Sequence, residues 1–391
     1  MTAAPVTGGQ PAEQPASCFG VAPPPPEDTS ERPRPGETSP PPLPVPQSPV
    51  GGPRMGECGQ VLPPDAPAPP EQVHVGSWML ADLDSGAVVA AQDPHARQRP
   101  ASCIKVLTAL VALHDLKMDD TITATQQDAD QEGSKVGLAP GATYTVRQVL
   151  TGMLMRSGND AAHALAAKVG GPEAMVDRMN ALAREIGAHD TRTATPSGLD
   201  GPGMSASAYD LALIFRAAER NPEFARAVAT REITLPGPPG QPPVQVTNDN
   251  DVLKKYPGAI GGKSGFTDDA RHTFIAAAQR GQRRLVAVLM RGENKPPNHQ
   301  YEQAMQLLDY GFSLNGAQPV GELYQQPPPP PPPSPREAET RSASSQTEGS
   351  VLGTVGAPVG LVVVAGAAVA AVLVQRRRRA RAARADSDEH P

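Results

Sequence analysis

The chain has 391 residues, of which 47 are proline and only 3% are aromatic. Three cysteines in this length exclude a small disulfide-stapled protein, and glycine and proline without a three-residue period exclude collagen. The net charge of −6 at neutral pH provides no basic footprint for nucleic acid, so we expect no nucleic-acid partner.

Proline divides the chain into parts. Residues 1–70 hold 21 of the 47 prolines, and residues 327–335 hold another eight. Such stretches cannot form helix interiors or central strands. We therefore predict a disordered leader over residues 1–72, one folded domain over residues 73–323 and a Pro-rich linker over residues 324–350.

The folded part opens with two apolar runs, residues 77–83 and 87–91, on either side of Asp84-Ser85-Gly86, which predicts a β-hairpin. Helical spacing of apolar residues recurs over residues 102–116, 146–155, 160–169, 173–186, 207–219 and 301–312. Residues 273–278 and 285–290 predict a second hairpin. Strands at both ends with helices between them predict an α+β domain, in which helices cover one antiparallel sheet and the last helix lies against it.

The first motif that carries chemistry is Ser102-Cys103-Ile104-Lys105, at the start of a predicted helix. Residues three apart share a helix face, so the hydroxyl and the amine can meet. A serine hydroxyl needs a base to become a nucleophile, and a lysine is that base only if burial or a nearby cation lowers its pKa. By itself the motif also fits a capping serine and a surface lysine.

The second motif, Ser157-Gly158-Asn159, precedes another predicted helix. Serine and asparagine are the usual residues at a helix N-cap, so the motif alone also fits a cap. A second Ser-x-Asn match, Ser313-Leu314-Asn315, is interpreted as chance.

The third motif, Lys263-Ser264-Gly265, lies just before the second predicted hairpin, after Gly261-Gly262. A cation and a hydroxyl on one strand can hold a carboxylate through charge-assisted hydrogen bonds. Glycines allow a ligand backbone to approach closely. The same residues alone also fit a Gly-rich turn with a surface lysine.

Residues 351–374 contain no charged side chain, and the tail over residues 375–391 carries six arginines against three acids. About 20 apolar residues span a bilayer as a helix. The positive-inside rule then predicts a single-pass transmembrane helix in the cell membrane, with a cytoplasmic C-terminus and an extracytoplasmic folded domain. The first residues lack the apolar segment of a secretory signal, from which we expect an incomplete N-terminus.

Together and in this order, the three motifs resemble the signature of penicillin-binding proteins and class A β-lactamases, in which the second motif reads Ser-Asp-Asn and the third Lys-Thr-Gly. Residues 132–138 and 195–201 extend the likeness. Residues 73–312 resemble the D-alanyl-D-alanine carboxypeptidases, which are low-mass penicillin-binding serine peptidases. The resemblance implies the β-lactamase and penicillin-binding-protein transpeptidase fold. It also implies removal of the terminal D-Ala from peptidoglycan stem peptides, with β-lactams as inhibitors and with neither cofactor nor metal.

The resemblance implies the catalytic roles as well. Ser102 would attack the carbonyl between two D-alanines and form an acyl-enzyme, and Lys105 would accept its proton. Ser157 would pass a proton to the leaving D-Ala, while Asn159 would hold the substrate amide and Lys105. Cys103 stands where the family often has threonine, and we expect it to be a small buried apolar residue.

The substrate-binding roles follow from the third motif. Lys263 and Ser264, with Gly265 beside them, would bind the terminal carboxylate. The backbone N–H groups of Ser102 and Phe266 would form the oxyanion hole. Serine replaces the commoner threonine at residue 264 but keeps the hydroxyl. The second, all-β domain that the family often carries has no counterpart in the short segment after residue 312.

Two other functions stay open. A β-lactamase shares the motifs but needs a deacylating base, a Glu in class A, and no Glu between residues 157 and 263 has a matching local sequence. A non-catalytic anchored protein would only bind muropeptides. A metal enzyme is disfavoured because neither His-x-x-x-His nor Cys-x-x-Cys spacing occurs. His114, His163 and His272 are interpreted as structural.

Overall fold

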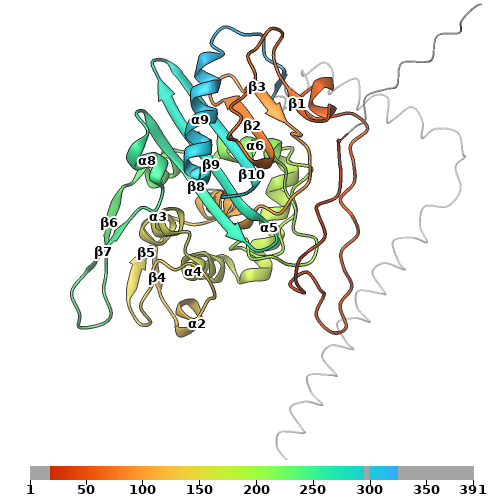
Figure 1. Ribbon diagram of the computed structural model, residues 1–391. Helices are drawn as coiled ribbons and strands as arrows, with labels where there is room; N and C mark the ends of the chain where they lie inside the picture. The colour runs from red at the N-terminus through yellow and green to blue at the C-terminus, as the bar shows by residue number, and fades with distance from the viewer. Residues whose placement is uncertain (1–17, 295–298, 325–391) are drawn as a thin grey trace, which may run out of the picture. The chain divides into compact units, whose positions relative to one another are not determined.

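An antiparallel sheet in the order β1-β3-β2-β10-β9-β8 runs through the molecule, and β11 pairs with the start of β3 (Figure 1). The computed structural model describes residues 18–294 and 299–324. The strands of the sheet are β1 Gln60–Val61, β2 Val75–Asp82, β3 Ala87–Gln92, β8 Ala259–Thr267, β9 Arg271–Arg280, β10 Arg283–Gly292 and β11 Gly321–Glu322. Two small hairpins lie outside it, β4 Thr121–Thr123 with β5 Thr143–Thr145 and β6 Glu232–Leu235 with β7 Val244–Thr247.

Both predicted hairpins are confirmed. The first is β2 with β3, where the Asp82 carboxylate accepts hydrogen bonds from the N–H groups of Asp84 and Ser85, and Gly86 takes a φ of +84°. The second is β9 with β10. The two hairpins, which are far apart in the sequence, thus become neighbours in the sheet, because β10 pairs with β2.

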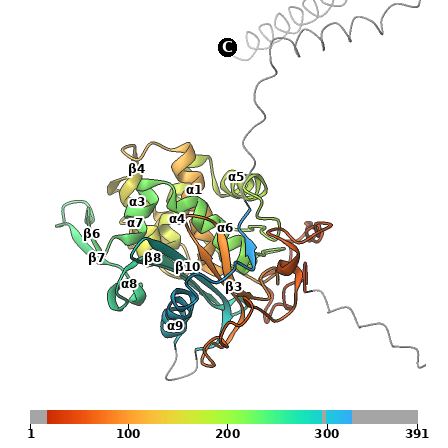
Figure 2. The same cartoon turned by 90° about the horizontal axis from the view of Figure 1, so that it is seen from above.

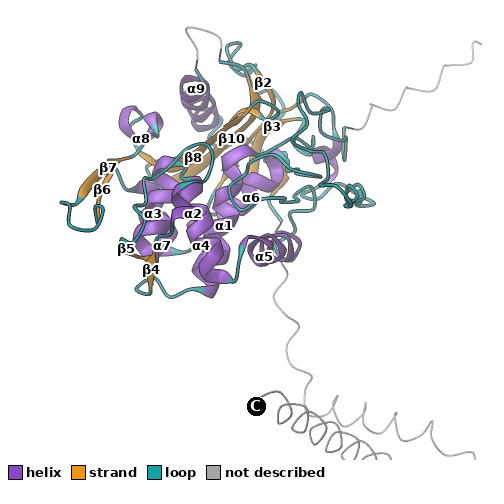
Figure 3. Cartoon of the chain, turned by 90° about the horizontal axis from the view of Figure 1, so that it is seen from below, coloured by secondary structure: helices purple, strands orange, loops and turns teal. Residues whose placement is uncertain are grey.

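The helices are α1 Lys105–Asp115, α2 Gln126–Ala129, α3 Val146–Arg156, α4 Asn159–Val169, α5 Pro172–Glu185, α6 Ala208–Glu219, α7 Pro222–Ala229, α8 Asp251–Lys255 and α9 Gln300–Ser313, with 3-10 turns at Pro53–Gly56 and Ala101–Ile104. All six predicted helices are present. The additional ones, α2, α7 and α8, were not predicted, because they are too short to show a helical period. Figure 2 shows α9 on one side of the sheet and α1, α3, α4 and α6 on the other, and Figure 3 shows the same division from below.

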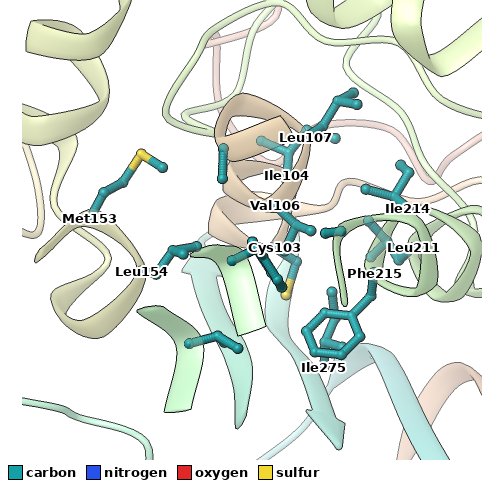
Figure 4. Close-up of a cluster of buried hydrophobic side chains, with 14 of the residues drawn as sticks. Cys103, Ile104, Val106, Leu107, Met153, Leu154, Leu211, Ile214, Phe215 and Ile275 are labelled. Atoms are coloured by element: carbon teal, nitrogen blue, oxygen red, sulfur yellow. The ribbon is translucent and has the colours of Figure 1, made fainter. Parts of the chain in front are cut away.

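Two apolar cores follow from these layers, one on each face of the sheet. Helix α1 lies inside the larger core, where its apolar side chains face Phe215 of α6 and Ile275 of β9 (Figure 4). Val106 and Leu107 of α1 are fully buried. A helix that is apolar on most sides is buried on most sides. Because protein interiors are closely packed, this burial fixes the position of Lys105 at the start of α1.

The prediction of a disordered leader over residues 1–72 was wrong for residues 18–72. A disulfide joins Cys18 to Cys58, and β1 pairs with β3. An extended Pro-rich chain has no internal hydrogen bonds, so its carbonyls are free to accept hydrogen bonds from the body. The guanidinium groups of Arg97 and Arg192 use them in this way. The folded body therefore begins before residue 73.

Several predictions concern residues outside the described ranges. These are the first 17 residues of the leader, the linker beyond Tyr324, the membrane helix over residues 351–374 and the basic tail over residues 375–391. Within residues 18–294 and 299–324, no helix has the length and apolar character needed to cross a bilayer.

Truncation of a core aromatic tests the packing of the sheet against α6. Phe215 is fully buried and makes an edge-on contact with Phe224. We expect Phe215→Ala to lower the free energy of unfolding by about 3–5 kcal/mol, because it removes a large apolar group and leaves a cavity. Chemical denaturation measures this loss. Phe266→Ala, at a side chain that is 52% exposed, is the control and should cost about 0.5 kcal/mol or less.

Candidate active site

Ser102 lies in the 3-10 turn Ala101–Ile104, and Lys105 is the first residue of α1. Side chains at i and i+3 eclipse one another in a 3-10 turn. The Lys105 Nζ atom is accordingly 2.7 Å from the Ser102 Oγ atom. The predicted meeting of hydroxyl and amine is therefore present, on the turn before the helix rather than within it.

Lys105 is completely buried, and among the described residues its amine has three neutral oxygen partners, of which the Ser102 hydroxyl is one. Its Nζ atom donates to the Asn159 Oδ1 atom at 2.7 Å and to the backbone carbonyl of Ser197. The Asn159 amide is oriented by its own donation, at 2.6 Å, to the backbone carbonyl of Glu132. Burial lowers the pKa of Lys105 well below its usual range, and the cation of Lys263 adds to the effect. The amine is therefore able to be neutral and to accept a proton.

Ser157 ends α3 in the left-handed conformation, with a φ of 57° and a ψ of 27°. This conformation is uncommon for residues other than glycine and concentrates at functional sites. The Ser157 Oγ atom accepts a hydrogen bond, at 2.9 Å, from the Nζ atom of Lys263 in the middle of β8. Burial lowers the pKa of Lys263 to about 8, so it remains a cation at neutral pH.

Strand β8 is the last strand on its side of the sheet and lies against the serine turn. A Cβ atom on Gly265 would lie 2.6 Å from the backbone nitrogen of Ser102, so only glycine permits this approach. A Cβ atom on Gly198 would lie 2.1 Å from the carbonyl oxygen of Ala101 on the other side of the turn. An extended peptide can add to a sheet edge of this kind and deliver a carbonyl to the serine.

These groups surround an open cleft of about 400 Å³. It is lined by Ser102, Gly133, Ser134, Arg156, Ser157, Asn159, Gly198, Leu199, Asp249, Ser264, Gly265, Phe266, Thr267, His272, Gln300 and Tyr301. Six of the eight predicted site residues are in this lining. The other two, Lys105 and Lys263, lie buried beneath it with their amines at Ser102 and Ser157. The fold thus brings together all eight residues from three distant parts of the sequence.

From the sequence we interpreted His272 as structural and did not predict that it lies at the cleft. His272 lines the cleft beside the exposed ring of Phe266, with 4.7 Å between the ring centroids. Burial lowers the pKa of His272, so the ring is neutral at physiological pH. The other two histidines pair with acids away from the cleft, His114 with Asp115 and His163 with Asp128.

Asp160 is a supporting residue that the sequence did not single out. Its buried carboxylate accepts hydrogen bonds from the backbone N–H groups of Val136, Gly137 and Leu138 at 2.8–3.0 Å. This anchors the loop whose Glu132 carbonyl orients Asn159. Acids are common in the first turn of a helix because they interact favourably with the helix dipole. The sequence therefore gave no sign that Asp160 also has hydrogen-bond partners far away in the chain.

A second charged cluster lies apart from the cleft. The ligand atoms of His95, Asp190 and Asp210 lie within 4.8 Å of one another, the spacing of a possible metal site. Each is already engaged in a hydrogen bond within the protein. The Asp190 carboxylate accepts from His95 Nδ1 at 2.7 Å and from Arg97 Nε at 2.9 Å, and Asp210 accepts from the Thr191 hydroxyl at 2.8 Å. Burial and the neighbouring Asp190 raise the pKa of Asp210 to about 8, so we describe the cluster as a buried hydrogen-bond network.

The role of Asp160 can be measured as stability. We expect Asp160→Ala to lower the free energy of unfolding by about 3 kcal/mol, because three N–H groups, two of them in buried residues, lose a charged acceptor at once. Asp160→Asn keeps the shape and one acceptor oxygen, so it should cost less. Equal stability of the alanine variant and the unchanged protein in urea would contradict this role.

The comparisons with known proteins agree with this geometry. Residues 64–294 match the family model described as D-alanyl-D-alanine carboxypeptidase. D-alanyl-D-alanine carboxypeptidase DacB2 of Mycobacterium tuberculosis is 47% identical over 269 residues, which cover 68% of this chain and 89% of the relative.

Solved structures extend the likeness to three dimensions. A crystal structure of D-alanyl-D-alanine carboxypeptidase from Mycobacterium tuberculosis has a TM-score of 0.64 at 45% identity, covering 67% of this chain and all of that one. The Streptomyces K15 DD-transpeptidase has a TM-score of 0.59 at 26% identity, covering 63% of this chain and all of that one. The transpeptidase-like α+β fold expected from the sequence is thus confirmed. By sequence and by fold, this chain belongs to the D-alanyl-D-alanine carboxypeptidase family of serine peptidases.

Proposed function

We propose that this protein removes the terminal D-Ala of peptidoglycan stem peptides through an acyl-enzyme on Ser102, with Lys105 as the base. The observation that carries the proposal is the 2.7 Å contact between the Lys105 Nζ atom and the Ser102 Oγ atom, at a lysine that is fully buried. A buried amine without a carboxylate partner is a better base than an exposed one, because burial disfavours its charged form.

Acylation begins when the Ser102 Oγ atom attacks the carbonyl carbon between the two D-alanines and its proton passes to Lys105. The backbone N–H groups of Ser102 and Phe266 stabilise the oxyanion, and such donors are typically worth about 3 kcal/mol each in the transition state. The C–N bond then breaks, and the leaving amine takes a proton through Ser157. Asn159 holds both the substrate amide and Lys105 in position.

The substrate carboxylate binds at the Lys263 end of the cleft. Lys263 is a cation at neutral pH, and Ser264 adds a hydroxyl on the same strand. A charge-assisted pair of this kind selects a peptide that ends in a free carboxylate. This requirement distinguishes an exopeptidase from a general serine protease.

Slow release of a β-lactam adduct follows from the composition of the cleft. Among the described residues that line it, Asp249 is the only acid, and it pairs with Arg156. A class A β-lactamase relies on a Glu for deacylation. Water must therefore be activated here by the same groups that served acylation, which a bound β-lactam obstructs.

We also propose that the catalytic domain works outside the cytoplasm, anchored by residues 351–374. The uncharged run of 24 residues followed by six arginines supports a single-pass anchor with a cytoplasmic C-terminus. The disulfide between Cys18 and Cys58 supports an oxidising compartment. Peptidoglycan lies in the same compartment.

Intact-mass analysis after incubation with penicillin tests the nucleophile. We expect one adduct of the mass of the drug, which persists for minutes or longer and disappears in Ser102→Ala. Ser313→Ala, in the second Ser-x-Asn sequence, is the matched control and should be labelled like the unchanged protein. Consumption of penicillin without an adduct would instead indicate a β-lactamase, and neither adduct nor consumption would indicate a domain that only binds.

The pH dependence tests the two lysines. Lys105 acts as a base only when neutral, and its pKa is lowered, so kcat/KM on a D-Ala-D-Ala peptide should fall about tenfold per unit on the acid side once Lys105 becomes protonated. Lys263 must be charged, and its pKa is about 8, so KM should rise above that pH. Steady-state rates from pH 5 to pH 10 measure both limbs. A flat profile from pH 5 to pH 9 would contradict the assigned roles.

A further inference from the structure

We propose that the N-terminal arm, residues 18–58, positions the catalytic turn, and that Glu31 is its principal positioning residue. The inference rests on the proposed function of Ser102, and it concerns a part of the chain outside the matched family region, which begins at residue 64. Figure 1 draws the arm in red as a long loop beside the body.

Arg99, three residues before Ser102, takes most of its partners from the arm. Its side chain is 2% exposed. The guanidinium donates from Nε to the Glu31 carboxylate and from Nη1 to the backbone carbonyl of Pro24. The body contributes the carboxylate of Asp269, at the longer distance of 3.9 Å from Nε. A buried guanidinium without its partners is strongly unfavourable, so the arm and the segment before Ser102 are coupled.

Arg97 repeats this arrangement two residues earlier. Its Nη1 and Nη2 atoms donate to the carbonyls of Leu43 and Pro44, each at 2.8 Å, while Nε donates to Asp190. Its side chain is also nearly buried. The segment that leads into the nucleophile is therefore held from one side by the body and from the other by the arm.

The same arm also holds the turn between β8 and β9. The Asp269 carboxylate accepts hydrogen bonds from the backbone N–H of Glu27 and from the Ser30 hydroxyl, and the Glu27 carboxylate pairs with Arg271. This turn directly follows Phe266 on β8. The arm thus connects the two segments that supply the proposed oxyanion donors, the N–H groups of Ser102 and Phe266.

The catalytic turn needs such support. Ala101 has a φ of +45°, which is rare for a residue with a side chain, and such conformations persist only where the surroundings enforce them. From the body, the Thr273 hydroxyl donates to the Pro100 carbonyl at 2.8 Å. A displacement of about 1 Å at a reacting group can cost about a hundredfold in rate, so a loosened turn is measurable.

The disulfide restricts the conformations of the arm before it docks. It joins Cys18 to Cys58, which lie 40 residues apart, and all the arm contacts to Arg97 and Arg99 fall inside the loop it closes. A closed loop has fewer conformations when undocked, so less entropy is lost when it docks. A proline-rich composition acts in the same direction.

The test compares Glu31→Ala with the unchanged full-length protein. We measure the second-order rate constant for acylation by penicillin and, on a D-Ala-D-Ala peptide, kcat and KM separately. We expect the acylation rate and kcat to fall about tenfold or more, with KM changed by about twofold or less, because the carboxylate site at Lys263 is untouched. Glu57→Gln is the matched control, since this arm acid pairs with Arg54 at a partly exposed site and should leave the rates unchanged.

Glu31→Gln retains the size and one acceptor oxygen, so an intermediate rate with an unchanged melting temperature supports positioning. It also serves if the alanine variant does not fold. Unchanged rates in folded Glu31→Ala would overturn the inference, as would an equal loss in Glu57→Gln. Failure of the unchanged protein to react with penicillin would instead refute the proposed function.

Discussion

The arrangement around Ser102 depends on the burial of Lys105, which lowers the pKa of its amine. Burial alone favours the neutral amine, and the cation of Lys263 adds to that preference. Satisfying a buried amine with a carboxylate would reverse the effect, because an opposite charge raises the pKa of a lysine. The hydrogen-bond partners of Lys105 are accordingly a hydroxyl, an amide oxygen and a backbone carbonyl. These partners hold the amine in position while adding no formal charge.

An acid does lie close by, and the fold prevents it from pairing with the lysine. Asp160 directly follows Asn159 on α4, yet its carboxylate is occupied by the N–H groups of three consecutive residues, 136–138. The carboxylate therefore stabilises the loop that orients Asn159 and forms no ion pair with Lys105, although its charge partly offsets the lowering of the Lys105 pKa. The same helix start thus provides a neutral partner for Lys105 and a charged anchor for the loop.

We infer that the arm, which lies outside the matched family region, adds a second level of support. The helices and the sheet bring the serine, the lysines and the edge of β8 together, and α1 is fixed because the larger core surrounds it. Arg97 and Arg99 precede the turn that carries Ser102, and their guanidinium groups take hydrogen-bond partners from the arm. This gives the proline-rich segment a structural purpose that composition alone does not reveal.

The sequence by itself determined the α+β class, both long hairpins and the six longer helices, because hydrophobic period is a local property. The eight residues gathered at the cleft were indicated by the resemblance of the three motifs to a known family. The sequence did not determine the short elements α2, α7 and α8, which are too brief to show a period. Only the tertiary structure decided the burial of Lys105 and Lys263, the role of the Ser197 carbonyl and the anchoring by Asp160. It also decided that residues 18–72 are ordered, since proline-rich composition reports the absence of internal hydrogen bonds but not whether distant arginines will supply them.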